Sequence, residues 1–159
     1  MITSNIKIRN ASGNDIPAIT ELFYNCINNI CIKEYTKDQI QIWANQAKNI
    51  AIWEFKIQKD FFIVVEIDSE IVGFGSLEPE GCVDLLYVHH EYQNRGIASK
   101  IIATIENEAK DKGLLKVWTD SSSIALPFFL KKNYQIERKY EKKVQGILFS
   151  NTILSRTLK

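Results

Sequence analysis

The chain has 159 residues, a formal net charge of +1 and a pI near 7.7, so acidic and basic side chains are balanced. This balance argues against a nucleic-acid-binding protein, which typically has a clustered basic face and a much higher pI. A chain of this length can bury a substantial core of its own. We therefore expect residues 1–159 to form a single domain that binds no nucleic acid.

Cysteine usage and hydropathy indicate the compartment. Cys26, Cys31 and Cys82 are odd in number and lack the paired spacing of metal ligands, so neither a disulfide framework nor a metal site is expected. The first ten residues, MITSNIKIRN, contain no apolar core of a secretion signal, and no stretch reaches the apolar length of a membrane span. The expected location is the cytoplasm, without a membrane partner.

The N-terminal third of the chain predicts a short strand and two helices. Ile6 and Ile8 alternate with charged residues, as in a strand. Asp15 leads a first helix, and Thr36 with Gln39 three residues later forms the capping box of a second. The apolar faces of these helices consist of Ile16, Ile19, Leu22, Phe23 and Ile27 in the first, and Ile40, Trp43, Ala44 and Ala47 in the second.

The next segment predicts a β-hairpin. FFIVVEI (residues 61–67) and IVGFGSL (residues 71–77) have the composition of strands, and residues 68–70 form a tight connection between them. Gly73 and Gly75 lie inside the second strand, which indicates that another element packs closely against its backbone.

The remaining chain completes the order of elements. A strand is expected over residues 82–88, and an apolar-periodic helix over residues 96–111 ends before Gly113. Further expected elements are a strand in LLKVWT (residues 114–119), a short helix at residues 125–132, and strands at residues 135–144 and 147–157. The order is strand, two helices, three strands, helix, strand, helix and two strands, which predicts an α/β (α+β) fold.

The run YVHHEYQNRGIAS, residues 87–99, predicts a phosphate-binding site. A strand leads through a glycine-bearing turn directly into a helix, whose first N–H groups have no intrahelical partner and lie at the positive end of the helix dipole. Gly96 has no Cβ, so phosphate oxygens can approach its backbone, and small Ala98 keeps the same path open. Gln93 and Arg95 supply side-chain donors beside it.

The sequence QxxGxA in this turn resembles the acetyl-CoA pyrophosphate loop of the GNAT superfamily of N-acetyltransferases. CVDLLYV (residues 82–88) matches the strand that the family places before the loop. SSSIALPFFLKKNY (residues 121–134) is similar to the second family signature. The resemblance implies a GNAT acetyltransferase domain over residues 1–159, with a mixed central sheet of about seven strands and about four helices.

The resemblance also implies where acetyl-CoA binds as co-substrate. The backbone of Leu86, Tyr87 and Val88 would hold the pantetheine arm, with the Val88 amide as the oxyanion donor. Ser122 occupies the position of an Asn that touches this arm in many relatives, and Phe129 lies in an aromatic pair against the cofactor. The pyrophosphate would lie on Gln93, Asn94, Arg95, Gly96, Ile97, Ala98 and Ser99.

The proton-transfer groups depart from the family pattern. Relatives commonly have a tyrosine general acid at the position of Phe129, and a phenyl ring has no proton to donate. Tyr134 is the nearest hydroxyl in sequence and is the candidate acid, although an aromatic residue there is more often part of the core; the thiolate could also leave without an acid. Asp84 is the candidate base, with a solvent-facing or salt-bridged carboxylate as the alternative.

Three functions remain open at this point. The leading hypothesis is direct transfer from acetyl-CoA to the primary amine of a small molecule in a ternary complex, with Tyr24, Tyr35 and Trp43 either lining the acceptor pocket or forming core. A peptide or protein acceptor would instead need an open groove near residues 28–38. The third hypothesis is a regulatory module that binds acyl-CoA without turnover. A homodimer formed through the final strands is a further expectation.

Overall fold

The computed structural model describes residues 5–159; residues 1–4, the start of the segment considered as a secretion signal, lie outside this range. Within residues 5–159, seven strands form two antiparallel sheets. The first has the order β1-β2-β3-β4, with β1 (Ile6–Asn10), β2 (Phe61–Ile67), β3 (Glu70–Leu77) and β4 (Val83–Val88). The second has the order β5-β7-β6, with β5 (Lys116–Ser121), β6 (Gln135–Val144) and β7 (Ile147–Thr157).

The two sheets meet at one end of β4 and β5 and separate from there. A parallel bridge joins Cys82 to Trp118, whose N–H donates to the carbonyl of Gly81 over 3.0 Å. The Thr119 hydroxyl adds a bond of 2.9 Å to the carbonyl of Val83. The predicted mixed α/β architecture with seven strands is confirmed, and its sheet opens between β4 and β5.

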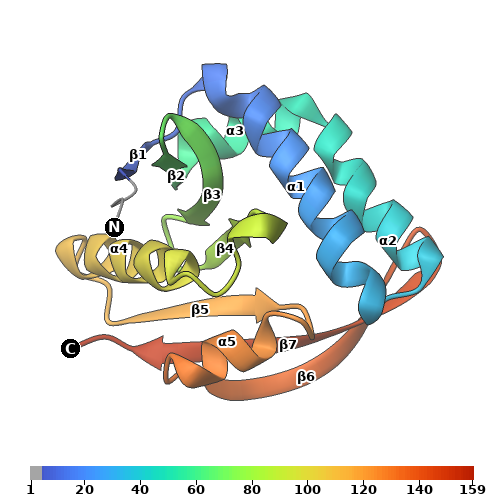
Figure 1. Cartoon of the computed structure of the whole chain (residues 1–159). Coiled ribbons are helices and arrows are strands. Elements are labelled where there is room, and N and C mark those ends of the chain that lie inside the picture. The colour runs from blue at the N-terminus through green and yellow to red at the C-terminus, as the bar shows by residue number, and fades with distance from the viewer. Residues whose placement is uncertain (1–4) are drawn as a thin grey trace.

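In the part of the chain that the structure describes, five α-helices surround the sheets (Figure 1). They are α1 (Ile16–Ile30), α2 (Lys37–Ala44), α3 (Ile50–Lys59), α4 (Ile97–Asp111) and α5 (Leu126–Lys131). Helices α1 to α3 cover one face of the first sheet, where their apolar residues share a core with Phe62, Val64 and Phe74. Helix α4 covers the opposite face, and α5 lies against the second sheet (Figure 1). Both faces of the first sheet are therefore buried.

Helix α3 is the element that the sequence analysis missed. The capping box of α2 is confirmed, with Gln39 N–H bonded to Thr36 Oγ1 over 3.2 Å. Helix α3, by contrast, buries Trp53 but leaves Ile52 and Phe55 46% and 57% exposed. Its apolar residues do not gather on one face, so the helical period that marks an amphipathic helix is weak here.

Helix α4 approaches β3 at the two glycines. A Cβ at Gly75 would lie 2.4 Å from Cγ2 of Ile101, and one at Gly73 would lie 3.2 Å from Cδ1 of the same residue. The close packing expected from these glycines is therefore present. This contact fixes the height of α4 over the sheet and, with it, the position of the loop that precedes the helix.

We expect Gly75→Ala to lower the free energy of unfolding by about 1 to 3 kcal/mol, because the added methyl group must displace Ile101. Gly73→Ala is the matched control. Its contacts of 3.2 Å require smaller shifts, and the strand gains about 0.5 to 1 kcal/mol from losing a flexible glycine. Urea unfolding of both variants measures the difference. Equal midpoints would contradict the tight approach of α4 at Gly75.

Candidate active site

The loop before α4 leaves the first turn of the helix open. Asn94 and Gly96 have φ angles of 61° and 80°, which turn the chain sharply into the helix. No side chain caps the N-terminus, and the first turn contains no acidic residue. The N–H groups of Ile97, Ala98 and Ser99 precede the first helical hydrogen bond and have no partner within the helix. An anion can therefore bind these donors at the positive end of the dipole.

The surroundings of this turn also fit a phosphate. A Cβ at Gly96 would meet no atom within 4 Å, so the space beside the backbone is open. The Arg95 guanidinium lies 4.9 Å above the Tyr92 ring, a cation–π contact that holds it beside the loop. Gln93 donates a side-chain bond of 2.7 Å to the carbonyl of Val88 and so ties the loop to the end of β4.

The backbone of β4 has one edge paired with β3 and one edge facing the gap. His89 N–H donates to the carbonyl of Val72 over 2.8 Å, and Tyr87 is opposite Phe74 in the same register. Because antiparallel residues alternate in the direction of their polar groups, the N–H and C=O groups of Leu86 and Val88 point away from β3. The bond from Gln93 to the Val88 carbonyl agrees with this direction.

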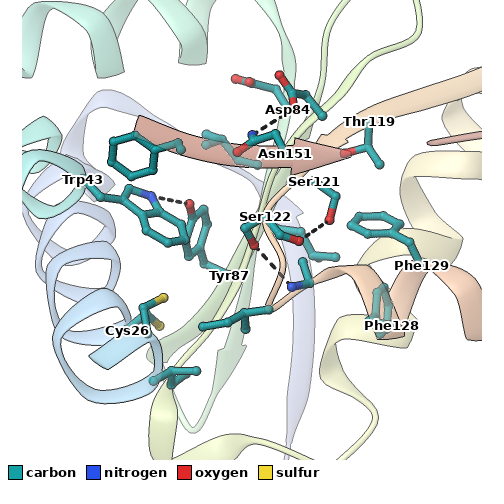
Figure 2. Close-up of a pocket in the computed structure, with 18 of the residues that line it drawn as sticks. Cys26, Trp43, Asp84, Tyr87, Thr119, Ser121, Ser122, Phe128, Phe129 and Asn151 are labelled. Atoms are coloured by element: carbon teal, nitrogen blue, oxygen red, sulfur yellow. Dashed lines mark hydrogen bonds between the residues drawn. The ribbon is translucent and has the colours of Figure 1, made fainter. Parts of the chain in front are cut away.

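A cavity of about 370 Å³ occupies the gap between β4 and β5 (Figure 2). Eight of the predicted site residues line it: Asp84, Leu86, Tyr87, Val88, Gln93, Ala98, Ser122 and Phe129. Asn94, Arg95, Gly96, Ile97 and Ser99 lie in the adjoining loop and first turn of α4. The Ile97 side chain is buried in the core, so its N–H is the part available to a ligand. The Ser122 hydroxyl accepts the Ala125 N–H over 3.2 Å at the start of α5.

Asp84 lies at a β-bulge. Leu85 is opposite Ser76 and Val83 is opposite Leu77, which leaves Asp84 as the extra residue of the strand. Its carboxylate forms an ion pair with Lys56 of α3 and lines both the main cavity and a second one of about 170 Å³. The carboxylate is thus salt-bridged and also reaches the cavity. Lys56 offsets the cost of its partial burial.

Tyr134 is not placed for the role that the sequence suggested. Its ring is buried in the core and its hydroxyl donates to Glu106 over 2.7 Å; Arg156 donates to the same carboxylate over 2.9 Å. Burial and the Glu106 carboxylate raise the pKa of the Tyr134 phenol far above its usual range. Tyr134 is absent from the lining of the cavity. Tyr134 thus lies in the core, the alternative that the sequence left open, with its hydroxyl proton donated to Glu106.

Sequence reasoning missed a second carboxylate in the cavity. Asp120 of β5 lines the same space and accepts hydrogen bonds from the Tyr140 hydroxyl and from Asn151 Nδ2, the latter over 2.9 Å. Lys142 Nζ lies 4.0 Å from its carboxylate. The signal in the sequence was weak, because Asp120 is a single acidic residue near the end of a short strand. Only the opening between β4 and β5 places it in one cavity with Asp84.

Aromatic rings form the wall next to the helices. The indole N–H of Trp43 donates to the Tyr87 hydroxyl over 3.2 Å (Figure 2). The Tyr35 ring packs on Trp43 with centroids 5.2 Å apart. Burial raises the pKa of the Tyr87 phenol above its usual range. Tyr35 and Trp43 line the cavity, which is one of the two roles expected for them, the other being core. Tyr24 is 44% exposed and does not line the cavity.

Two cysteines on this wall are not nucleophiles at neutral pH. Cys26 and Cys31 line the cavity, and burial raises the pKa of each thiol to about 12. The Cys26 thiol donates to the carbonyl of Val88 over 3.0 Å. Burial also raises the pKa of Cys82 well above its usual range. Since the thiolate is the reactive form, these groups behave as small apolar side chains.

Comparison with known proteins identifies the family. The model of the acetyltransferase (GNAT) domain matches residues 31–154. The chain is also 30% identical over 148 residues to the uncharacterized N-acetyltransferase YafP of Escherichia coli (strain K12), covering 93% of each chain. The chain belongs to the GNAT acetyltransferases.

Solved structures share this fold along almost the whole chain. A GCN5-related N-acetyltransferase from Rhodopseudomonas palustris is 25% identical and superposes with a TM-score of 0.93, covering 99% of both chains. The PaiA N-acetyltransferase from Thermoplasma acidophilum, in complex with coenzyme A, is 19% identical with a TM-score of 0.81 and covers 96% of this chain and 99% of its own.

Two further findings concern residues 5–159. Their helices include none that combines the length and the apolar character needed to cross a bilayer. In the same part of the chain, His, Cys, Asp and Glu side chains form no group of three or more that could hold a metal ion.

We expect Gly96→Ala to weaken acetyl-CoA binding by about tenfold, because a methyl group would enter the open space beside the α4 amides. Gly113→Ala is the matched control, since Gly113 has the same φ of +80° and the same open surroundings at the other end of the helix. Both variants should lose about 1 kcal/mol of stability from backbone strain. Calorimetric titration should find weaker binding in Gly96→Ala alone; an equal effect of both would contradict the placement of the phosphate.

Tyr134→Phe tests whether the hydroxyl of that residue has a structural role. Removing the hydroxyl leaves Glu106 with one donor fewer, so the free energy of unfolding should fall by about 1 to 3 kcal/mol. Below the unfolding transition, kcat should stay at the wild-type value. Tyr24→Phe, at an exposed ring, should change neither quantity. A large loss of kcat in a stably folded Tyr134→Phe protein would restore its catalytic role.

Proposed function

We propose that this GNAT protein is an acetyl-CoA-dependent N-acetyltransferase that acts on the primary amine of a small molecule by direct transfer in a ternary complex. One observation carries the proposal. The uncapped start of α4, the unpaired edge of β4 and a pair of carboxylates all border one continuous cavity of about 370 Å³. These are the donors for a pyrophosphate, the donors for an amide-bearing arm and a site for an amine.

The cofactor residues follow from this geometry. The amides of Ile97, Ala98 and Ser99 would bind the pyrophosphate, and the outward groups of Leu86 and Val88 would bind the pantetheine arm. When bound, acetyl-CoA supplies an activated acetyl thioester. The coenzyme A complex of the PaiA relative supports this assignment.

Direct transfer is favoured by the chemistry of the lining residues. Cys26 and Cys31 are protonated at neutral pH and offer no thiolate for a covalent intermediate. The Val88 N–H points into the gap, where an oxyanion donor can lower the barrier by about 3 kcal/mol. Asp84 reaches the cavity from the bulge and would take the proton of the attacking amine.

A small acceptor is favoured because two contacts close the acceptor end. The Tyr35 hydroxyl bonds to the Ser123 N–H over 3.1 Å and joins the segment after α1 to the loop before α5. Gln39 donates to the carbonyl of Leu148 over 2.7 Å and joins α2 to β7. The stretch at residues 28–38 therefore lacks the open groove that a peptide would need. This closure disfavours a protein N-terminus or lysine as acceptor.

The charges at this end favour an amine that arrives as an ammonium ion. Asp84 and Asp120 line the cavity from β4 and β5, and the aromatic faces of Tyr35, Trp43 and Phe149 line it as well. Carboxylates and aromatic faces both attract a cation. An acyl-CoA sensor without turnover would have no need for these groups, which is the argument against that alternative.

Location and assembly are part of the same proposal. Three free cysteines fit the reducing cytoplasm. A homodimer would use β6, the edge of the second sheet, although its Lys, Arg and Glu side chains are of the kind that protects an edge strand from pairing.

The test is release of coenzyme A thiol from acetyl-CoA with a panel of small amines, amino acids and short peptides. We expect turnover with one class of small amine and none with peptides. Asp84→Asn should lower kcat by about 10²-fold or more and leave acetyl-CoA affinity unchanged, whereas Asp111→Asn at the end of α4 should have no effect. Acetyl-CoA binding without turnover on any amine would favour the sensor, and turnover on peptides would contradict the small acceptor.

A further inference from the structure

The cavity lacks the general acid that relatives place on α5. Phe129 occupies that position and lines the cavity without a hydroxyl (Figure 2). Tyr134 is committed to Glu106. Among the described residues that line the cavity, the phenols are Tyr35 and Tyr87. The departing thiolate therefore has two candidate proton donors, and their surroundings differ.

Tyr87 is held within the aromatic core. Its ring lies 5.0 Å from Phe23 and 5.3 Å from Phe74 between centroids, under the helices that cover the first sheet. Its hydroxyl accepts the indole N–H of Trp43. These contacts direct the phenol toward the wall formed by the helices.

Tyr35 reaches the loop before α5. Its hydroxyl oxygen accepts the Ser123 N–H over 3.1 Å and shares a hydroxyl–hydroxyl hydrogen bond of 3.0 Å with Ser123, whose hydroxyl also lies 3.5 Å from the Glu34 carboxylate. Ser123 directly follows Ser122, the residue expected against the pantetheine arm, and both precede the α5 turn that presents Phe128 and Phe129. The Tyr35 hydroxyl is thus held beside Ser122 at the lining of the cavity.

We propose that Tyr35 is the general acid that protonates the coenzyme A thiolate, in place of the tyrosine that relatives have at the position of Phe129. This inference rests on the proposed function. The amine nitrogen bonds to the acetyl carbonyl carbon, the carbon–sulfur bond breaks and its electron pair stays on sulfur. The Tyr35 O–H proton moves to that sulfur. The proton lost by the amine is taken up at Asp84 and returns to the phenolate through solvent.

The hydrogen bond from the Ser123 N–H explains why this phenol is suited to the role. It is accepted by the Tyr35 oxygen, so it stabilises the negative charge that develops when the proton leaves. The packing of Tyr35 on Trp43 fixes the ring, so the hydroxyl needs little reorientation during the reaction. The catalytic proton then comes from the N-terminal helical segment, which also closes the acceptor site.

Tyr35→Phe is the first test, with the amine that the panel identifies. General acid catalysis contributes about 10²-fold or more, so kcat should fall by that factor while calorimetric affinity for acetyl-CoA stays unchanged. Ser123→Ala keeps the phenol proton and the hydrogen bond from the backbone N–H, so its kcat should fall much less. Tyr24→Phe is the control at an exposed ring. Wild-type kcat in Tyr35→Phe would overturn the proposal.

A second measurement needs no acceptor. Coenzyme A is bound to saturation and its thiol is titrated through the ultraviolet absorbance of the thiolate. An O–H donated by Tyr35 stabilises the thiolate, so the pKa of the bound thiol should be lower in the wild type than in Tyr35→Phe. Equal values would overturn the role of Tyr35. Absence of turnover on every amine, with this difference present, would instead count against the proposed function alone.

Discussion

The one-sided pairing of β4 is the constraint on which the site depends. Its inner edge is bonded to β3, and its outer edge meets β5 only near Cys82 and Trp118. On this outer edge the Leu86 N–H and C=O and the Val88 N–H face the cavity, whereas the Val88 carbonyl is bonded to Gln93 and to the Cys26 thiol. The gap therefore favours a ligand with amide groups of its own, which can complete the ladder. The same opening creates the cavity into which the start of α4 and the carboxylates face.

The packing of α4 connects this strand edge to the loop before the helix. Gly75 lets the helix approach β3 closely, and Gln93 ties the loop to the carbonyl of Val88. The helix N-terminus is consequently held in line with the open edge of β4. A pyrophosphate bound at the helix and an arm bound along the strand can thus belong to one molecule, without rearrangement of the loop.

Local signals in the sequence predicted the helices and strands, whereas contacts between distant residues determine which side chains line the candidate site. The capping box at Thr36, the hairpin over residues 61–77 and the turn at Gly96 are encoded by neighbouring residues, and all are present. Helix α3 was missed because Ile52 and Phe55 are exposed, so its apolar residues do not follow the helical period of a single apolar face. Asp120 and the bond between Tyr35 and Ser123 depend on residues far apart in the chain, so no local pattern could reveal them.

Hydrogen exchange of the β4 amides tests the central claim most directly. In the free protein, the N–H groups of Leu85 and Tyr87 bond to β3 and should exchange slowly, while those of Leu86 and Val88 face the gap and should exchange faster. Addition of acetyl-CoA should slow the exchange of Leu86 and Val88 selectively. Unchanged exchange at these two amides under saturating acetyl-CoA would contradict the account, because the cofactor would then bind somewhere other than the open edge of β4.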